Sequence, residues 1–206
     1  MLPWKRILKV LKWTGIILGT LLVLGVIIRI PHVLEVQKTA EQVAKIHATK
    51  LTLADVMGDN LPPDPGAEAD KTIAGIDANT NGIRDDVELA IFKEYPDSAR
   101  TRAALLQYAL ALQIEMTLPF LNKEVVTASI EDNESRADVC LWSLSSRLDM
   151  DKFIADMNKY RAFIEGLQVN TTERKLYIQN FYSYMGSYSS SNDGCDIDVS
   201  KLENLR

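Results

Sequence analysis

Histidine and cysteine are scarce in this sequence of 206 residues, which contains two of each. His32 directly follows a long apolar run. His47 lies on the apolar side of an expected amphipathic helix, where we expect a half-buried helix contact. The patterns G-x-S-x-G and H-E-x-x-H and a glycine-rich phosphate loop are all missing, so histidine-based nucleophilic catalysis has few candidate residues. We assign no catalytic residue and do not expect an enzyme.

Acidic residues are missing from the first 30 positions, although the chain contains 28 of them. The same positions hold five of the 23 basic residues, so 18 basic residues face all 28 acidic ones in the remainder. A body this acidic repels phosphate backbones and attracts divalent cations. Nucleic acid is therefore not an expected partner.

The uncharged apolar run from Trp13 to Ile28 accounts for this asymmetry. Its length as a helix, about 24 Å, comes close to a hydrocarbon core of about 30 Å when Lys9 and Lys12 extend to the interface. A cleaved secretory signal is the alternative, but the run ends in "RIPHVLEV" and not in small residues at A-x-A spacing. We expect a single-pass anchor over residues 1–30 and an amphipathic stalk helix over 31–50.

The basic residues before the apolar run also predict the orientation of the anchor. The positive-inside rule holds the amino terminus in the cytoplasm and sends the rest of the chain across the inner membrane to the periplasmic or extracellular side. Cysteine usage agrees, because an isolated pair in an oxidising compartment is most simply a disulfide. We expect Cys140 and Cys195 to form it, since Cys195 lies in the polar segment "SSSNDGCDID" and is an unconvincing buried thiol. The acidic residues Asp193, Asp196 and Asp198 are expected to form a solvated tail.

Proline and glycine concentrate in residues 51–76, which predicts a linker without helices or strands. Helical periodicity follows, in a helix from Asp86 to Tyr95 and in a second one capped by Asp97. The second helix, "AALLQYALALQIEMTL", is apolar nearly all round and should lie at the centre of the core. Because no segment reads as a strand, the sequence predicts a mainly α fold with a helical domain over residues 77–206.

The segment "DANTNGIRDDVE", residues 77–88, matches the calcium-loop pattern D-x-[DN]-x-[DN]-G-x5-E without a gap. Calcium binds six to eight oxygen atoms, and alternate side chains of a tightly wound loop can point to one centre. Gly82 supplies the sharp turn that a β-carbon would obstruct. The alternative is an Asx-rich turn that only caps the next helix. The expected ligands are Asp77, Asn79, Asn81, the Ile83 carbonyl, Asp85 (directly or through water) and Glu88.

This loop resembles the thrombospondin type-3 and related EF-hand-like bacterial calcium loops, which read D-x-D-x-D-G-I-x-D-x-x-E. The resemblance covers about a dozen residues and implies calcium binding alone. The chain has a single copy, Asn79 and Asn81 replace two aspartates, and Arg84 stands where paired EF-hands carry an apolar residue. Fewer charges predict a weak site with a Kd of about 10⁻⁴ to 10⁻³ M, a structural clip that is filled outside the cytoplasm.

These features together favour a membrane-anchored, calcium-stabilised helical module in a bacterial envelope that binds or scaffolds other proteins. One alternative is an accessory subunit of a larger membrane complex, with the anchor and stalk packed against other membrane chains. Another is an envelope hydrolase that uses a carboxylate pair, which a deep pocket lined by two or more carboxylates away from the calcium loop would favour.

Overall fold

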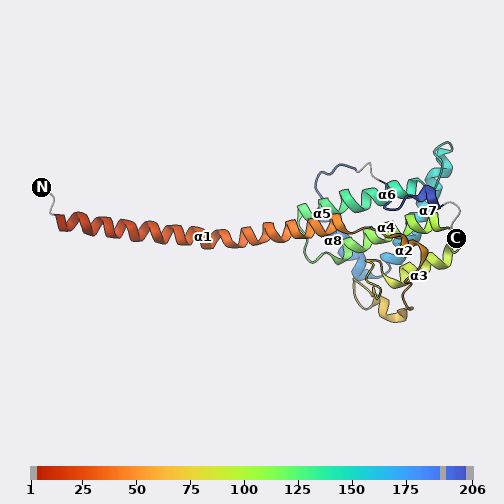
Figure 1. Ribbon diagram of the computed structural model, residues 1–206, viewed down its shortest axis with the longest axis horizontal. Coiled ribbons are helices and arrows are strands. Elements are labelled where there is room, and N and C mark those ends of the chain that lie inside the picture. Colours follow the sequence, from red (N-terminus) through yellow and green to blue (C-terminus); the bar gives the residue numbers. More distant parts are fainter. Residues whose placement is uncertain (1–3, 191–193, 203–206) are drawn as a thin grey trace. The chain divides into compact units, whose positions relative to one another are not determined.

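The computed structural model describes residues 4–190 and 194–202, and none of these residues forms a strand. The predicted mainly α fold is therefore confirmed. The chain divides into two compact units, Met1–Gln42 and Val43–Arg206 (Figure 1). The α-helices are α1 (Trp4–Ala48), α2 (Leu53–Met57), α3 (Asp85–Glu94), α4 (Ala99–Thr117), α5 (Lys123–Ser129), α6 (Ser135–Trp142), α7 (Met150–Gln168) and α8 (Thr172–Ser183). The 3-10 helices η1 (Gly66–Asp70) and η3 (Val199–Leu202) and the π-helical turn η2 (Ile130–Glu134) complete the set.

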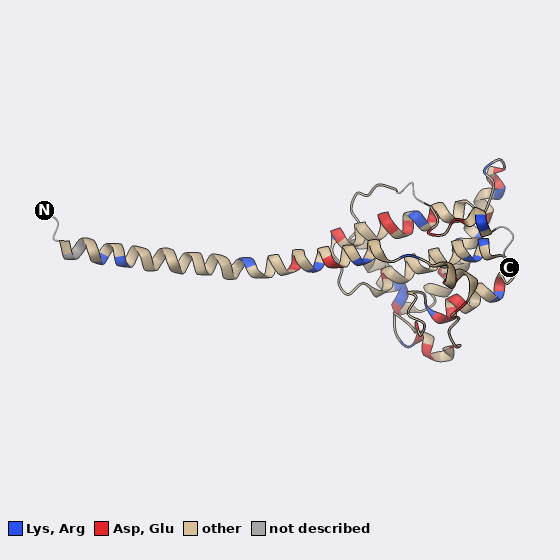
Figure 2. Cartoon of the chain, in the orientation of Figure 1, with Lys and Arg blue, Asp and Glu red and all other residues tan. Residues whose placement is uncertain are grey.

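Helix α1 is one continuous helix of 45 residues that includes Pro31, so the expected anchor and stalk are not separate elements. Proline removes one backbone donor but does not end this helix. The segment Ile7–Ala48 is long and apolar enough to cross a membrane, and no residue of its most apolar stretch is buried. Figure 2 shows that this apolar stretch of α1 is free of charged residues. A continuous apolar surface of this size fits anchoring in a lipid bilayer.

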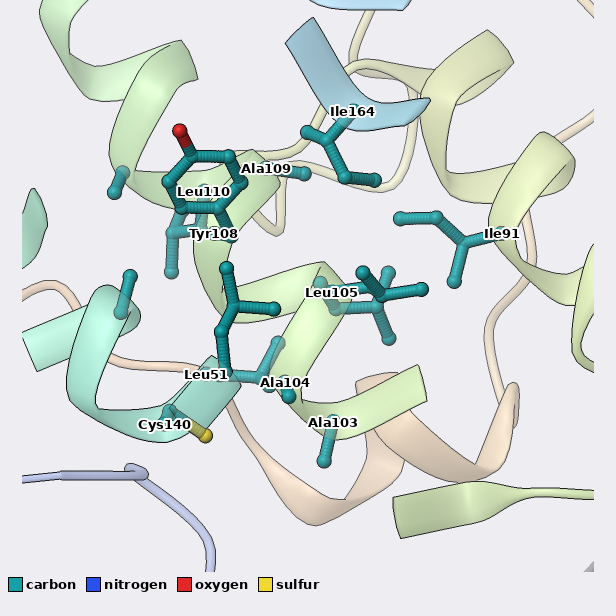
Figure 3. Close-up of a cluster of buried hydrophobic side chains, with 14 of the residues drawn as sticks. Leu51, Ile91, Ala103, Ala104, Leu105, Tyr108, Ala109, Leu110, Cys140 and Ile164 are labelled. Carbon is teal, nitrogen blue, oxygen red and sulfur yellow. The ribbon is translucent and has the colours of Figure 1, made fainter. Parts of the chain in front are cut away.

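Helix α4 forms the centre of the second unit, as the sequence predicts. Of its 19 residues, 15 are buried. It contacts α2, α3, α5, α6, α7 and α8, and a helix surrounded in this way carries apolar residues on every side. Figure 3 shows Leu105, Tyr108 and Leu110 of α4 among side chains from the neighbouring segments, including Ile91 and Ile164.

A smaller apolar cluster lies in the same unit, where α5 and α8 meet the last turns of α1. Its buried members are Ile46, Leu118, Val125, Val126, Ile130 and Phe181. His47 is next to this cluster in sequence, and its side chain is 53% exposed with Nδ1 3.0 Å from Asp132 Oδ2. His47 was expected in a half-buried helix contact, but its side chain is exposed and pairs with Asp132 of η2.

Two local predictions were wrong. The segment 51–76 is not free of helices, because Thr52 and Asp55 form a reciprocal capping box that starts α2, and η1 follows the prolines. The N-cap of α4 is Ser98 and not Asp97, since the Ser98 side chain accepts a hydrogen bond from the Thr101 N–H. In the second case two neighbouring residues offered equivalent capping groups, and the backbone geometry selected Ser98.

The carboxyl-terminal segment is held by a disulfide and by a buried ion pair. Cys140 of α6 is bonded to Cys195, as expected. Asp196 was expected in a solvated tail, but its side chain is 4% exposed and paired with Arg136. Its second oxygen accepts a hydrogen bond from the Leu51 N–H at 2.9 Å. Asp198 is exposed, as expected, and Asp193 lies outside the described residues.

Replacing Leu105 with alanine tests the position of the core. Leu105 is fully buried, and a truncation there leaves a cavity, so Leu105→Ala should lower the free energy of unfolding by about 2–5 kcal/mol. Leu148 is 99% exposed, and Leu148→Ala should change it by less than about 0.5 kcal/mol. Urea unfolding of the full chain in detergent, followed by circular dichroism, measures both. Equal losses for the two variants would contradict the described core.

Candidate metal-binding loop

The loop Asp77–Glu88 turns sharply because two of its residues adopt left-handed backbone conformations. Thr80 has φ 59° and Gly82 has φ 85°. A β-carbon at Gly82 would also lie 2.8 Å from Leu110 Cδ1, so both the backbone and the packing against α4 require glycine here. Glycine at position 82 thus allows the loop to pack closely against α4.

Asp77 stabilises this turn by accepting hydrogen bonds from two backbone amides. Its Oδ1 lies 3.1 Å from the Asn81 nitrogen, and its Oδ2 lies 3.0 Å from the Gly82 nitrogen. Asn81 Oδ1 in turn accepts a hydrogen bond from the Ile83 N–H at 2.9 Å. These contacts direct successive side chains of the loop toward its interior.

The side chains of Asn79 and Asn81 converge on the carboxylate of Glu88. Asn79 Nδ2 lies 3.0 Å from Glu88 Oε2, and Asn81 Nδ2 lies 3.1 Å from Glu88 Oε1. Glu88 is 1% exposed, and burial raises its pKa to about 7. No ion pair to Glu88 occurs among the described residues. A buried carboxylate that is held only by neutral amides is an unusual and costly arrangement.

Asp85 lies elsewhere in the loop and has a different partner. Both of its carboxylate oxygens accept the Ala78 N–H, at 3.0 and 3.2 Å, and its own N–H donates to the Ile76 carbonyl at 2.9 Å. Its burial raises the pKa of this carboxyl. Ile83 packs its side chain into the main core. The loop thus brings together Asn79, Asn81 and Glu88 of the expected ligands, with Asp77 adjoining through the Asn81 N–H, whereas Asp85 closes the loop on its own backbone.

Acidic side chains alone do not form the candidate site. Within the part of the chain that the structure describes, no group of three or more His, Cys, Asp or Glu side chains is arranged to hold a metal ion. The donor set of the loop consists instead of carboxylates, carboxamides and a backbone carbonyl, which are all oxygen donors of the kind that calcium accepts. A half-turn of each amide would present Oδ1 to the site in place of Nδ2, at the cost of the hydrogen bonds that Asn81 Oδ1 accepts from the Ile83 N–H and that Asn79 Nδ2 donates to the Asn60 carbonyl.

Arg84 joins the loop to the end of helix α7. Its side chain is fully buried and reaches the carboxyl end of α7, where it donates to the carbonyl oxygens of Leu167 at 2.6 Å and Gln168 at 3.3 Å. Asp86 balances the charge at 2.5 Å. Cations favour the carboxyl end of a helix, where carbonyl groups lack partners. At the position through which two EF-hand loops pair, this chain has Arg84, which binds α7 instead.

Long polar side chains also hold the segment that precedes the loop. Arg174 of α8 donates to the carbonyl oxygens of Ala69, Thr72 and Ile73 and to the carboxylate of Asp70, at 2.6 to 3.0 Å. The Gln113 amide donates to the Ala74 carbonyl at 2.6 Å. Sequence reasoning missed these anchors, because each joins residues 39 to 105 positions apart.

The loop has a solvent-facing side along which an ion can enter. A cleft of about 380 Å³ is lined by Asp77, Thr80, Asn81 and Gly82 of the loop. Gln113, Ile114 and Thr117 of α4 line the opposite wall. The Asn79 amide, meanwhile, donates to the Asn60 carbonyl at 3.0 Å, which joins the loop to the residue before the proline-rich stretch.

A second groove bears on the hydrolase alternative. It has a volume of about 570 Å³, and its lining includes Glu124 and Glu131 together with His47 and Ser187. It is an open surface depression, and the Glu131 carboxylate already accepts hydrogen bonds from Ser189. No hydrogen bond joins His47 to Ser187 among the described residues. The groove does not provide the deep pocket with two available carboxylates that the hydrolase alternative needs.

Comparison with known proteins adds no relative: no protein-family model matches the sequence, and no curated protein or solved structure matches the chain.

The variant Glu88→Gln tests the cost of the buried carboxylate without calcium. A carboxyl with a raised pKa keeps its proton longer in the folded state, so its contribution to stability is full at low pH and is lost as pH rises through about 7. With a chelator at about pH 8, Glu88→Gln should equal or exceed the wild type in unfolding free energy, by up to roughly 3 kcal/mol. Urea unfolding measures the difference. A large loss of stability would show that the carboxylate itself holds the calcium-free loop together.

Proposed function

We propose that this chain is a membrane-anchored helical module whose loop Asp77–Glu88 binds calcium. The observation that carries this proposal is the buried carboxylate of Glu88, which two loop carboxamides surround and which no cationic side chain of the described residues neutralises. A divalent ion there would offset the buried negative charge. The left-handed residues and the cleft beside the loop support the same proposal.

Asp77, Asn79, Asn81 and Glu88 would hold the ion, with the Ile83 carbonyl and Asp85 as the remaining expected ligands. Bound calcium supplies charge neutralisation and a fixed centre for these oxygens. The loop residues themselves do the structural work, because Glu88 belongs to α3 and the loop directly follows the segment that Gln113 and Arg174 hold. Calcium would therefore tie the proline-rich segment to α3, as a clip and not as a sensor.

The same proposal places the domain outside the cytoplasm. A Kd of about 10⁻⁴ to 10⁻³ M keeps the site filled only where calcium is plentiful. The disulfide Cys140–Cys195 is of the kind that persists in oxidising compartments, and the basic residues before the apolar run favour a cytoplasmic amino terminus. We therefore infer a single-pass protein of the inner membrane with its helical domain on the periplasmic or extracellular side.

Binding or scaffolding of another envelope protein is the role that we infer for the domain, with an accessory subunit of a larger membrane complex as the second candidate. The long apolar surface of α1 favours the second candidate if other membrane chains cover it. Purification in a mild detergent separates the two candidates. An obligate subunit should retain stoichiometric partners, whereas a transient binding module should elute without them.

A thermal melt of the full chain in detergent tests calcium binding. Millimolar calcium should stabilise the domain by about 1–2 kcal/mol over a chelator, which raises the midpoint by a few degrees, and magnesium should do so far less. Asp77→Ala and Glu88→Gln should remove this gain. Asp59→Ala is the matched control, since Asp59 is an exposed acid near the loop that makes no side-chain contact with it. Equal midpoints with calcium, chelator and magnesium would leave the loop as a helix-capping turn.

A reporter fused after residue 206 tests the orientation separately. A reporter enzyme that is active only outside the cytoplasm should be active in this fusion, since four basic residues precede the apolar run and Arg29 alone follows it directly. Activity from a cytosolic reporter at the same position would reverse the proposed topology. Such a result would leave calcium binding by the isolated loop untouched but would remove its expected supply of calcium.

A further inference from the structure

Two glutamates outside the calcium loop form a pair in the interior of the helical unit. Glu115 belongs to α4 and is fully buried, and Glu134 is the last residue of the π-helical turn η2. Both carboxyl groups reach the same hydroxyl, that of Tyr182, so they lie close together. Two ionised carboxylates repel each other at such a site, and a proton on one of them would relieve that repulsion.

Tyr182 of α8 closes the pair from a third element. Its hydroxyl lies 3.2 Å from Glu134 Oε1 and 3.5 Å from Glu115 Oε2. The remaining oxygen of Glu115, Oε1, is buried and has no hydrogen-bond partner. A phenol hydroxyl has one proton to donate, and it cannot neutralise two negative charges. One proton shared by the two carboxyl groups would therefore supply the missing hydrogen bond and remove one of the two negative charges.

Among the residues that the structure describes, the charged groups around the pair do not supply a free cation. Asp138 of α6 faces the pair, and Arg161 of α7 is bound to Asp138 at 2.6 Å. Glu165 of α7 accepts a hydrogen bond from Tyr108 of α4 at 2.8 Å. On the remaining neighbour, α5, the buried side chains are Val125, Val126, Ala128 and Ser129, none of which is charged.

We propose that Glu115 and Glu134 share one proton and form a pH-sensitive lock between α4, η2 and α8, which loosens when that proton is lost. Two adjacent carboxylates in a buried site repel each other, and neither is well solvated. Burial raises the pKa of both carboxyls above the ordinary range of glutamate, most strongly for Glu115. The proton is thus retained at a pH at which an exposed pair would have lost it.

The π-helical turn is the element that yields when the pair ionises. A π turn is wider than an α-helical turn and occurs mostly as a single turn inside an α-helix, often at functional sites. Here η2 joins α5 directly to α6, so residues Lys123–Trp142 form one continuous helical segment whose irregular turn, Ile130–Glu134, ends at Glu134. Repulsion at Glu134 acts on this turn and on α8, which approaches it through Tyr182.

The sign of the pH dependence follows from proton linkage. The folded state holds a proton that the unfolded chain, with glutamate pKa values of about 4.3, has already released. The lock therefore contributes its full stability at low pH and loses it as pH rises toward the raised pKa of the pair. Across that interval the unfolding equilibrium constant should increase by up to about tenfold per pH unit.

The test uses the full chain in detergent with a chelator present, from about pH 5 to about pH 9. Urea unfolding should show a steeper pH dependence for the wild type than for Glu115→Gln, which has a neutral hydrogen-bond donor at position 115 at every pH and leaves Glu134 as the one carboxyl of the pair. Contributions from Glu88 are common to both proteins and cancel. Glu94→Gln, at an exposed position near the end of α3, is the matched control and should follow the wild type. Hydrogen exchange should show α8 and η2 losing protection at alkaline pH in the wild type and not in Glu115→Gln.

Infrared spectroscopy reports on the proton directly. At about pH 8, the wild type should show the C=O stretching band of a protonated carboxylic acid, and Glu115→Gln should lack it. If Glu115→Gln does not fold, the same comparison is made with Glu134→Gln.

Two results would overturn the lock. One is a parallel pH dependence in the wild type and in the glutamine variants, with the same infrared band in all of them. The other is a divalent ion retained by the pair in native mass spectrometry when Asp77→Ala and Glu88→Gln have disabled the calcium loop. In that case a cation and not a proton would neutralise the two carboxylates.

Discussion

Polar side chains on the enclosed helix α4 determine how the irregular parts of this protein are arranged. A helix that is buried on all sides has no solvent to satisfy such groups, so each of them needs a protein partner. Arg102 donates to the carbonyl oxygens of Val56, Tyr95 and Pro96. Gln107 contacts the carboxyl-terminal segment at Gly194 and Asp196. The loops around α4 are therefore ordered by its hydrogen-bonding needs as much as by apolar packing.

The same constraint connects the candidate calcium loop to the core. Gln113 of α4 holds Ala74, and Leu110 of α4 leaves room for no side chain at position 82. On the other side of the loop, Arg84 binds the end of α7. An ion in the loop would therefore act on a segment whose backbone is already largely fixed. Binding would therefore cost little conformational entropy, and the moderate gain that we expect reflects the small number of charged ligands.

Periodicity and local chemistry were sufficient to predict the helices but not their anchors. The all-round apolar pattern of α4 and the start of α3 at the oxygen-rich loop follow from residues close in sequence. Asp196 was predicted to be solvated, because nothing near it in sequence announces Arg136, 60 positions away. The Glu115–Glu134 pair was invisible for the same reason. Within the loop, the pattern identified Glu88 and the asparagines, while the turn of Asp85 toward Ala78 depends on backbone geometry that a pattern does not encode.

The contact between Leu51 and Asp196 has a consequence for the order in which the domain is made. These residues are 145 positions apart, and the disulfide of the neighbouring Cys195 reinforces their contact. Almost the whole domain must therefore be synthesised before Leu51, which follows α1, can contact Asp196. During that interval α4 has no complete enclosure, and its apolar faces are available to chaperones or to other nascent chains. Formation of the Cys140–Cys195 disulfide is then a late step of maturation, because it follows the pairing of segments from the two ends of the domain.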